Sequence, residues 1–329
     1  MKFEAIDSIL SPLSISIFLT EKYGLSDRNT CRILRTGINH TYLATDNEKK
    51  YVFRIYSYNW RTEIDIQEEL KLLNHLHDNA IPVSYPIADS VGQYIHKVEA
   101  PEGIRYTVLF SYAEGEKVRN LSLENCGDLG VLMGRMHQLT VNRTMKRVNY
   151  NVETLTHLPY QLAKEHFEES FEEMGFVRDA IALVEAAFKD VETVQLRFGT
   201  VHLDFWYDNM NLEQDGKITV FDFDFCGNGW LLLDIAYFMM QLFLTAPDKD
   251  LFELKAAAFY KGYATVAEIS EQEKQLLPVA GLAIWIFYLG VQSSRFDNWS
   301  NIFLTKNYLK HFMGMAKSWL SYNKVEVIS

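Results

Sequence analysis

Hydrophobic and polar positions alternate over short runs in the first third of the chain, a pattern typical of β-strands. The segment CRILRTGINHTYLATDNEKKYVFRIYS, residues 31–57, predicts three strands joined by a glycine-containing turn and a polar turn. Residues 63–79 place apolar side chains at helical spacing, and Ile81-Pro82 ends that helix. Two more strands are expected over residues 93–98 and 104–111. The pattern predicts an α+β domain, antiparallel strands with one helix inserted among them.

After residue 113 the apolar positions recur with the 3.6-residue period of helices. Helices are expected over residues 123–139, over residues 161–188, and almost throughout the chain after residue 231. The acidic run over residues 165–173 is interpreted as a solvated face of the second of these helices. The pattern therefore predicts a second, mainly helical domain.

Two short β-like runs interrupt the helical domain, over residues 209–212 and 218–225. Between them lies Asp215-Gly216, a dipeptide that favours a tight hairpin turn. We place the domain boundary after residue 112, which gives a β-rich domain over residues 1–112 and a helical domain over residues 113–329.

Composition indicates a packed globular protein, because 48% of the 329 residues are hydrophobic and 23% are charged. The 32 Lys and Arg against 43 Asp and Glu give a net charge of −11, which argues against nucleic acid as a partner. Three scattered cysteines without a CxxC pair argue against disulfides and thiolate zinc sites, so a cytoplasmic location is expected.

Two strongly apolar stretches, residues 230–246 and 277–291, are the candidates for membrane segments. The first contains Asp234, and the second is shorter than the roughly 20 residues that span a bilayer. The N-terminus carries Glu4 and Asp7 before its apolar stretch, unlike a signal peptide. We expect buried helices and no membrane partner, while the oligomeric state cannot be predicted.

The segment that indicates chemistry is TVHLDFWYDNMNLEQDGKITVFDFDF, in which His202, Asp204 and Asn209 have the spacing H-x-D-x-x-x-x-N. Phosphoryl transfer needs one carboxylate to orient the attacking hydroxyl, and oxygen ligands to hold Mg²⁺ on the nucleotide phosphates. Asp204 is the candidate base, and Asn209 and Asp222 are the candidate metal ligands. A hairpin centred on Asp215-Gly216 brings residues 209 and 222 side by side.

This segment resembles the catalytic and metal-binding loops of the protein-kinase-like phosphotransferases, above all the aminoglycoside phosphotransferase, choline kinase and type II homoserine kinase superfamily. The family commonly has Gly where this chain has Leu203, and it has a D-x-D motif where this chain has Asp222-Phe223-Asp224. The resemblance implies a protein-kinase-like bilobal fold, with a small antiparallel β-sheet lobe and a larger, mainly helical lobe. It also implies ATP and Mg²⁺ as cofactors.

The resemblance extends into the first domain and implies a nucleotide-binding lobe there. YVFRIY resembles the strand that carries a phosphate-binding Lys, but this chain has Arg54 at that position. Glu69 is then the helix carboxylate that pairs with it, with Glu68 as the alternative register. TVLFSYAEGE resembles the strand and hinge against adenine, which implies contacts from Phe110, Ser111, Tyr112 and Ala113.

Roles are also expected for three polar residues of the segment, His202, Asp208 and Asp224, and for Asp234, which follows it. His202 is expected to orient the loop by hydrogen bonds, and Asp208 to be a solvated turn residue. Asp224 is either a contact to substrate or a second metal, or a residue at a strand end. Asp234, on an apolar helix that resembles the helix bracing the family's catalytic loop, is expected to be hydrogen-bonded and structural.

The sequence thus predicts an ATP-dependent phosphotransferase that acts on a hydroxyl of a small molecule, such as an amino alcohol, hydroxy amino acid or aminoglycoside-like compound. Two alternatives are a Ser/Thr protein kinase of the bacterial stress-response type and a non-catalytic nucleotide-binding pseudokinase. A metal-dependent hydrolase that uses His202, Asp204, Asp222 and Asp224 as ligands ranks last. The identity of the acceptor is beyond the sequence.

Overall fold

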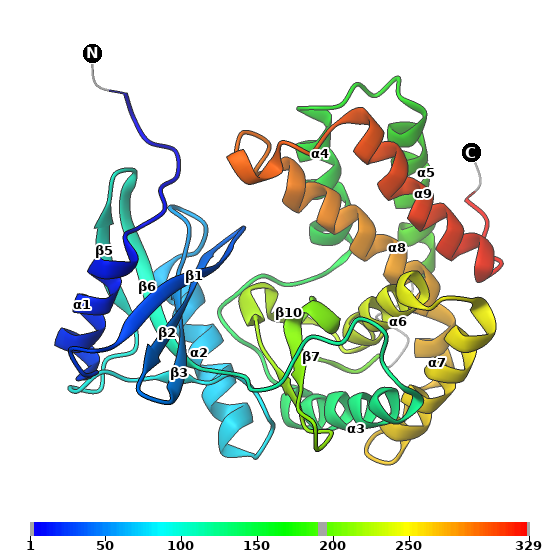
Figure 1. Cartoon of the computed structure of the whole chain (residues 1–329). Coiled ribbons are helices and arrows are strands. Elements are labelled where there is room, and N and C mark those ends of the chain that lie inside the picture. Colours follow the sequence, from blue (N-terminus) through cyan, green and yellow to red (C-terminus); the bar gives the residue numbers. More distant parts are fainter. Residues whose placement is uncertain (1–2, 190–195, 328–329) are drawn as a thin grey trace. The chain divides into compact units, whose positions relative to one another are not determined.

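A computed structural model describes residues 3–189 and 196–327 of the chain (Figure 1). The chain divides into two compact units, and each is described by itself. The first unit comprises Met1–Gly115 and the short segment Thr219–Phe221. The second comprises Glu116–Ile218 and Asp222–Ser329. The chain therefore leaves the first unit and returns to it for three residues.

The first unit is an antiparallel sheet with two helices. Its strands run in the order β1-β2-β3-β6-β4, and β5 also pairs with β6. The elements are α1 (Pro12–Tyr23), β1 (Thr30–Thr36), β2 (His40–Asp46), β3 (Lys49–Ile55), α2 (Glu63–Asp78), β4 (Pro86–Ile87), β5 (His96–Ala100) and β6 (Gly103–Ser111). The returning segment adds to this unit, because Val220 forms a parallel bridge with Val83. Its amide donates to the Pro82 carbonyl, and its carbonyl accepts from the Ser84 amide.

The helix after β3 begins and ends where local sequence dictates. Thr62 and Asp65 cap α2 reciprocally, side chain to backbone, which satisfies amide groups that the first turn leaves unpaired. Its apolar face, with Ile66 and Leu73, is buried. The three predicted strands, the inserted helix and the two following strands are all present, although the strand predicted over residues 93–98 lies at His96–Ala100.

The second unit is mainly helical. Its helices and strands are α3 (Leu123–Thr140), a π-helical turn (Glu153–His157), α4 (Leu158–Lys164), α5 (Glu172–Phe188), β7 (Phe198–Val201), β8 (Met210–Leu212), β10 (Gly227–Trp230), α6 (Leu232–Thr245), α7 (Lys249–Ala264), α8 (Glu271–Ser293) and α9 (Lys306–Tyr322). Between β8 and β10 lies β9 (Ile218–Val220), of which Thr219 and Val220 belong to the first unit. β7 pairs with β10 and β8 with β9. Short 3₁₀ turns lie at Tyr207–Asn209, Phe223–Phe225 and Trp299–Asn301.

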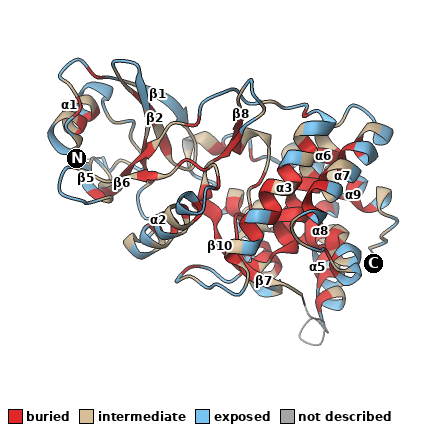
Figure 2. Ribbon diagram, turned by 90° about the horizontal axis from the view of Figure 1, so that it is seen from below, coloured by how far each residue is buried: buried red, intermediate tan, exposed pale blue. Residues whose placement is uncertain are grey.

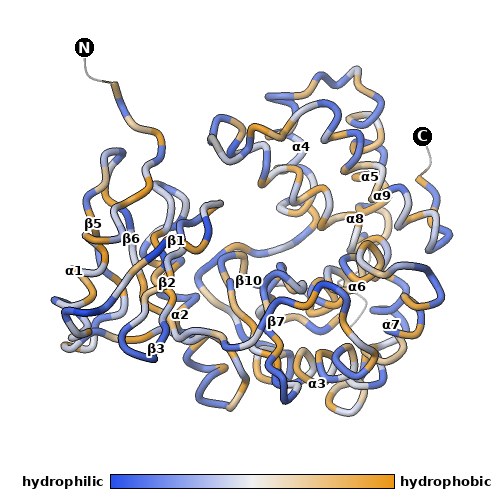
Figure 3. The backbone as a smooth tube through the Cα atoms, in the orientation of Figure 1, coloured by the Kyte–Doolittle hydropathy of each residue, from blue (hydrophilic) through white to orange (hydrophobic). Residues whose placement is uncertain are grey.

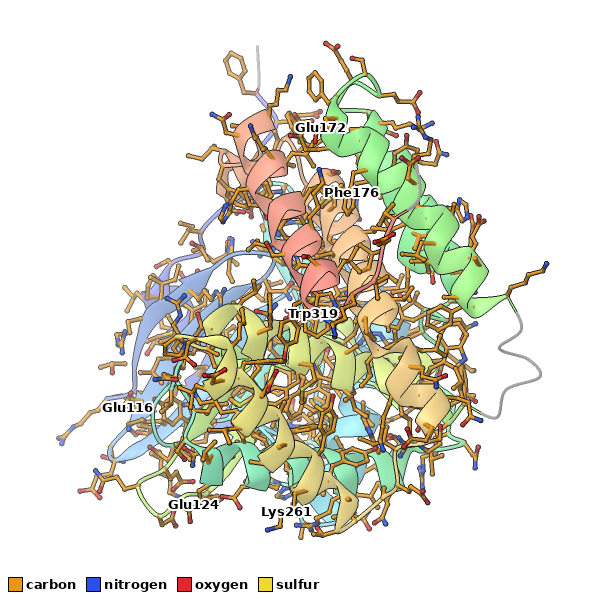
Figure 4. The ribbon with its side chains drawn as sticks, turned by 90° about the vertical axis from the view of Figure 1, so that its right-hand side faces the viewer. Glu116, Glu124, Glu172, Phe176, Lys261 and Trp319 are labelled. Atoms are coloured by element: carbon orange, nitrogen blue, oxygen red, sulfur yellow. The ribbon has the colours of Figure 1, made fainter. Side chains whose placement is uncertain are left out.

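Helices α6 and α8 pack against each other, most of α6 is buried (Figure 2), and its residues are mostly hydrophobic (Figure 3). By length and composition, α8 could cross a membrane, but 72% of its most apolar 18-residue window is buried inside the protein. This burial is typical of a core helix. The peripheral helices α5 and α9 pack together, and the Lys317 ammonium pairs with Glu172 at 3.1 Å and lies over the Phe176 ring (Figure 4).

Helices α3 and α7 pack backbone against backbone. A Cβ atom added to Gly130 of α3 would lie 2.1 Å from the Phe259 carbonyl oxygen of α7. A Cβ on Gly262 of α7 would lie 2.0 Å from the carbonyl oxygen of Gly127. Because real Cβ atoms do not approach so closely, these positions require glycine.

The expectation of one helix over residues 161–188 is wrong. Helix α4 ends at Lys164 and α5 begins at Glu172, so much of the acidic run at 165–173 is a connection and not a helix face. Phe167 turns into the core, and Glu169 turns back to pair with Lys164. The helical periodicity is overridden by these contacts.

Candidate active site

A sharply bent loop follows β7 and carries the H-x-D motif. The buried Asp234 carboxylate of α6 accepts a hydrogen bond from the amide of His202 at 2.9 Å and another from the amide of Leu203 at 2.7 Å. The Nε2 atom of His137 lies 3.3 Å from the same carboxylate. Asp234 therefore ties the loop backbone to the most buried helix of the second unit.

Leu203 adopts a left-handed backbone conformation, with φ at +62°. For a residue with a Cβ this conformation costs about 1–2 kcal/mol, so the surrounding contacts must hold it. Its amide donates to Asp234, its carbonyl accepts from the Tyr288 hydroxyl at 3.1 Å, and its side chain is fully buried. Leu203, at the position where the phosphotransferases that this chain resembles commonly have Gly, thus has a backbone conformation that glycine favours, and packing and hydrogen bonds hold it there.

Both carboxylate oxygens of Asp204 accept hydrogen bonds. The Asn209 side-chain nitrogen donates to Oδ2 at 2.6 Å, and the Tyr237 hydroxyl donates to Oδ1 at 2.5 Å. Burial raises the pKa of Asp204 above its ordinary value, the hydrogen bond from Tyr237 acts in the opposite direction, and the negative charge of Asp222 adds to the increase. The predicted base Asp204 therefore accepts a hydrogen bond from Asn209 and is influenced by the charge of Asp222, the two predicted metal ligands.

Asp222 lies in a turn and not at the end of a strand. The strand expected over residues 218–225 ends at Val220, so that expectation is wrong in extent. Asp222 has φ at +65° and begins the 3₁₀ turn over Phe223–Phe225. The hairpin turn itself is as predicted, since the Glu213 amide donates to the Lys217 carbonyl and Gly216 has φ at +90°.

The oxygen atoms of Asn209 and Asp222 suit a divalent cation. Because the amide nitrogen of Asn209 faces Asp204, its amide oxygen points away from that carboxylate. Two oxygen ligands from the protein are few for Mg²⁺, which usually keeps waters and takes the rest of its shell from substrate phosphates. Within residues 3–189 and 196–327 there is no group of three or more His, Cys, Asp or Glu side chains that could hold a metal ion. The hydrolase alternative, which needs four such ligands, has no such group in that part of the chain.

The other polar residues of the loop make contacts of their own. The Nδ1 atom of His202 accepts from the Asp204 amide at 3.2 Å, and its ring lies 4.3 Å from that of Phe223. Asp208, predicted to be a solvated turn residue, is partly buried and pairs with Lys117 at 2.6 Å. Asp224 is buried, and its backbone carbonyl accepts from the Arg147 guanidinium.

In the first unit, Arg54 of β3 and Glu69 of α2 form a buried ion pair with Nη1 and Oε1 3.1 Å apart. The Tyr56 hydroxyl donates to the second oxygen of Glu69 at 3.0 Å. Glu68, the alternative register, pairs instead with Lys71 near the surface. The structure therefore places Glu69, and not Glu68, beside Arg54.

The predicted hinge lies at the end of β6. Phe110 is buried, pairs with Pro86 of β4, and packs under the Arg54 guanidinium, 5.2 Å from the ring centre. Ser111 closes the strand, because its amide donates to the Tyr85 carbonyl and its hydroxyl accepts from the Tyr85 amide. Tyr112 lies under the Lys50 ammonium and Ala113 is buried.

Sequence reasoning missed the two tyrosines at the carboxylate. Neither Tyr237 nor Tyr288 is among the candidate residues that the sequence indicates. A signal for Tyr237 was present, since it follows Asp234 by three residues on one helix and so lies on the same face. For Tyr288, 85 residues from the loop, the sequence offers no signal.

Comparison with known proteins identifies the family and the fold of this chain. The model of the phosphotransferase enzyme family matches residues 30–269, more than half of the chain. A homoserine kinase of Methylobacillus glycogenes is 25% identical over 272 residues, which cover 80% of this chain and 80% of that protein.

Two solved structures show the same fold. An aminopropanol kinase associated with a microcompartment aligns with a TM-score of 0.77 and 20% identity, covering 96% of this chain and all of that one. An amicoumacin kinase in complex with AMP-PNP and Ca²⁺ aligns with a TM-score of 0.75 and 20% identity, covering 94% and 93%. The chain therefore belongs to the phosphotransferase enzyme family, has the protein-kinase-like fold and is a kinase that acts on an alcohol group.

Proposed function

We propose that the protein transfers the γ-phosphate of ATP to a hydroxyl group of a small cationic or zwitterionic molecule, an amino alcohol, hydroxy amino acid or aminoglycoside-like compound. The observation that supports this most directly is the arrangement around Asp204. Its carboxylate is hydrogen-bonded by Asn209 and influenced by the charge of Asp222. This is the set of groups that phosphoryl transfer to a hydroxyl requires.

In the proposed reaction Asp204 accepts a hydrogen bond from the acceptor hydroxyl and orients its oxygen toward the γ-phosphorus. A bond forms between that oxygen and phosphorus, the bond from phosphorus to the bridging oxygen of ADP breaks, and the hydroxyl proton passes to Asp204. Each carboxylate oxygen can accept two hydrogen bonds, so the contacts from Asn209 and Tyr237 leave room for the acceptor. Most of the rate enhancement then comes from positioning.

Asn209 and Asp222 would hold Mg²⁺ through their side-chain oxygens. When bound, this ion neutralises charge on the phosphates and orients them. Asp224 is proposed as a backbone support, because the Arg147 guanidinium donates to its carbonyl. His202 and Asp234 support the loop through the hydrogen bonds described above.

The first unit is proposed to bind the nucleotide. Arg54 would contact the α- and β-phosphates, with Glu69 fixing the guanidinium as the buried pair does. Residues 110–113 would contact adenine. An Arg in place of Lys presents a planar fork, which can bind phosphate oxygens in pairs. The intact pair favours a nucleotide-binding role for this unit, which the kinase and the nucleotide-binding pseudokinase share.

A small acceptor is favoured over a protein acceptor. Between Asp222 and Asp234 the chain forms only a 3₁₀ turn, β10 and the start of α6, which leaves no loop on which a peptide could dock. The homoserine kinase and the aminopropanol kinase are named for substrates that carry both an amine and a hydroxyl. The net charge of −11 favours acceptors with an amine, and the protein is proposed to act in the cytoplasm on such metabolites.

The test is an ADP-release screen of purified protein with ATP, Mg²⁺ and a panel of homoserine, aminopropanols, choline, ethanolamine and aminoglycosides. At least one amino-bearing acceptor should stimulate ADP release, and the phosphorylated product should be detected by mass spectrometry. The Asp204→Ala variant should bind ATP and lack this stimulation. ATP binding without product from any acceptor would support the pseudokinase, and transfer to bulk protein alone would support the protein kinase.

A further inference from the structure

Helix α6 contacts the catalytic loop through two side chains that lie one turn apart. Asp234 accepts from the backbone amides of residues 202 and 203, while Tyr237 donates to the side chain of Asp204. Residues three apart on a helix share one face, so a single surface of α6 holds both the backbone and the reactive group of this loop.

Helix α8 contacts the same loop from a second direction. The Tyr288 hydroxyl donates to the Leu203 carbonyl at 3.1 Å, on the opposite side of that residue from the amide held by Asp234. The ring of Tyr288 lies 5.6 Å from that of Tyr237, and its hydroxyl is within reach of the Asp204 carboxylate. The left-handed residue is thus held at both of its backbone polar groups.

We propose that Tyr237 and Tyr288 are positioning residues for phosphoryl transfer, which hold the Asp204 carboxylate and the left-handed Leu203 in the geometry that receives the acceptor hydroxyl. This inference rests on the proposed role of Asp204 as the base. Tyr237 fixes the side-chain rotamer of Asp204 through Oδ1, complementing Asn209 at Oδ2. Tyr288 fixes the backbone that carries it.

The phenol groups are suited to this task because they remain donors. Burial raises the pKa of both tyrosines well above the ordinary value, and the negative charge of Asp204 adds to the increase. Each phenol therefore keeps its proton over the working range of an enzyme. Phenylalanine would fill the same volume without a donor, so the hydroxyls and not the rings carry the positioning.

The experiment compares Tyr237→Phe and Tyr288→Phe with wild type, using the acceptor that the screen identifies. Each substitution removes one hydroxyl and leaves the ring, so the fold is expected to persist. Tyr160→Phe is the matched control, because that buried tyrosine donates to Glu169, which lies outside the loop. We expect kcat to fall about tenfold or more for Tyr237→Phe and several-fold for Tyr288→Phe, with KM for ATP unchanged and the control unaffected.

A double-mutant cycle separates positioning from general loosening of the protein. If Tyr237 acts through Asp204, then Tyr237→Phe lowers the rate in the wild-type background and has no further effect on the residual rate of Asp204→Asn. Equal losses in both backgrounds would overturn the proposal. A lower KM for the acceptor with unchanged kcat would also overturn it, since the phenol would then be competing with the substrate hydroxyl.

Hydrogen exchange of the segment containing residues 199–209 gives a readout independent of turnover. Tyr288→Phe should speed exchange of this segment at least several-fold, while Tyr160→Phe leaves it unchanged. Unchanged exchange and unchanged kcat in both tyrosine variants would refute the inference while leaving the kinase activity of the wild type established. A wild type that phosphorylates no acceptor would refute the proposed function, and this inference with it.

Discussion

Replacing Asp234 by Asn tests whether a carboxylate is needed to hold the catalytic loop. The side chain is 1% exposed and accepts from two backbone amides, at 2.9 and 2.7 Å. Asn has the same shape but only one acceptor oxygen, so its NH₂ group would face one of these amides. The lost bond leaves a buried N–H without an acceptor, which costs about 2 kcal/mol.

For a folded unit of the size of the second unit, a decrease of about 2 kcal/mol in the free energy of unfolding lowers Tm by about 4–8 °C. Differential scanning calorimetry of Asp234→Asn should show that decrease, and kcat for ADP release should fall at least tenfold because the backbone beside Asp204 is released. Asp128→Asn, an exposed change on α3, serves as the control and should alter neither quantity. A variant with Tm within 1 °C of wild type and full kcat would refute the reasoning.

Three further changes test other parts of the molecule. Asp204→Ala should abolish acceptor-stimulated ADP release while calorimetry still detects ATP binding, because the nucleotide contacts proposed here lie elsewhere. Glu69→Gln removes the charge opposite Arg54 and should raise KM for ATP about tenfold, measured by ADP release at saturating acceptor. Gly130→Ala places a methyl group 2.1 Å from the Phe259 carbonyl and should destabilise the protein to chemical denaturation by about 1–3 kcal/mol.

Two matched controls accompany these changes. Glu68→Gln alters a carboxylate that pairs with Lys71 near the surface, and KM for ATP should stay at the wild-type value. Gly175→Ala lies in α5 with no atom closer than 3.9 Å and should stabilise the protein by about 0.5–1 kcal/mol. If Glu68→Gln raised KM for ATP as much as Glu69→Gln, the contacts assigned to Glu69 would be contradicted. If Gly175→Ala destabilised the protein as much as Gly130→Ala, the contacts assigned to Gly130 would be contradicted.

Much of the fold could be predicted from local pattern, because alternation and helical spacing dominate the three strands β1–β3 and helices α2 and α3. Helix α1 was missed although its signals are in the sequence: Ser11 caps it, Pro12 begins it and Gly24 ends it in a left-handed conformation. The break at Phe167 could not be read from the sequence, since it depends on where that ring is buried in three dimensions.

The site shows the same division between local and distant information. The H-x-D spacing and the Asp215-Gly216 turn are local, and they were sufficient to predict that Asp204 and Asn209 lie close together, as the hydrogen bond between them shows. The positive φ angle of Leu203 is not local, because leucine does not favour that conformation. It is held by hydrogen bonds to Asp234 of α6 and Tyr288 of α8, helices that begin 29 or more residues after Leu203.

The excursion of Thr219–Phe221 into the first unit has a practical consequence for dissecting this protein. A fragment cut after Gly115 would lack Val220, leaving the Pro82 carbonyl and the Ser84 amide without their backbone partners. A continuous stretch of chain that ends at Gly115 is therefore not the whole first unit. A self-sufficient version of the first unit would need a strand equivalent to residues 219–221 supplied in trans or spliced to its end.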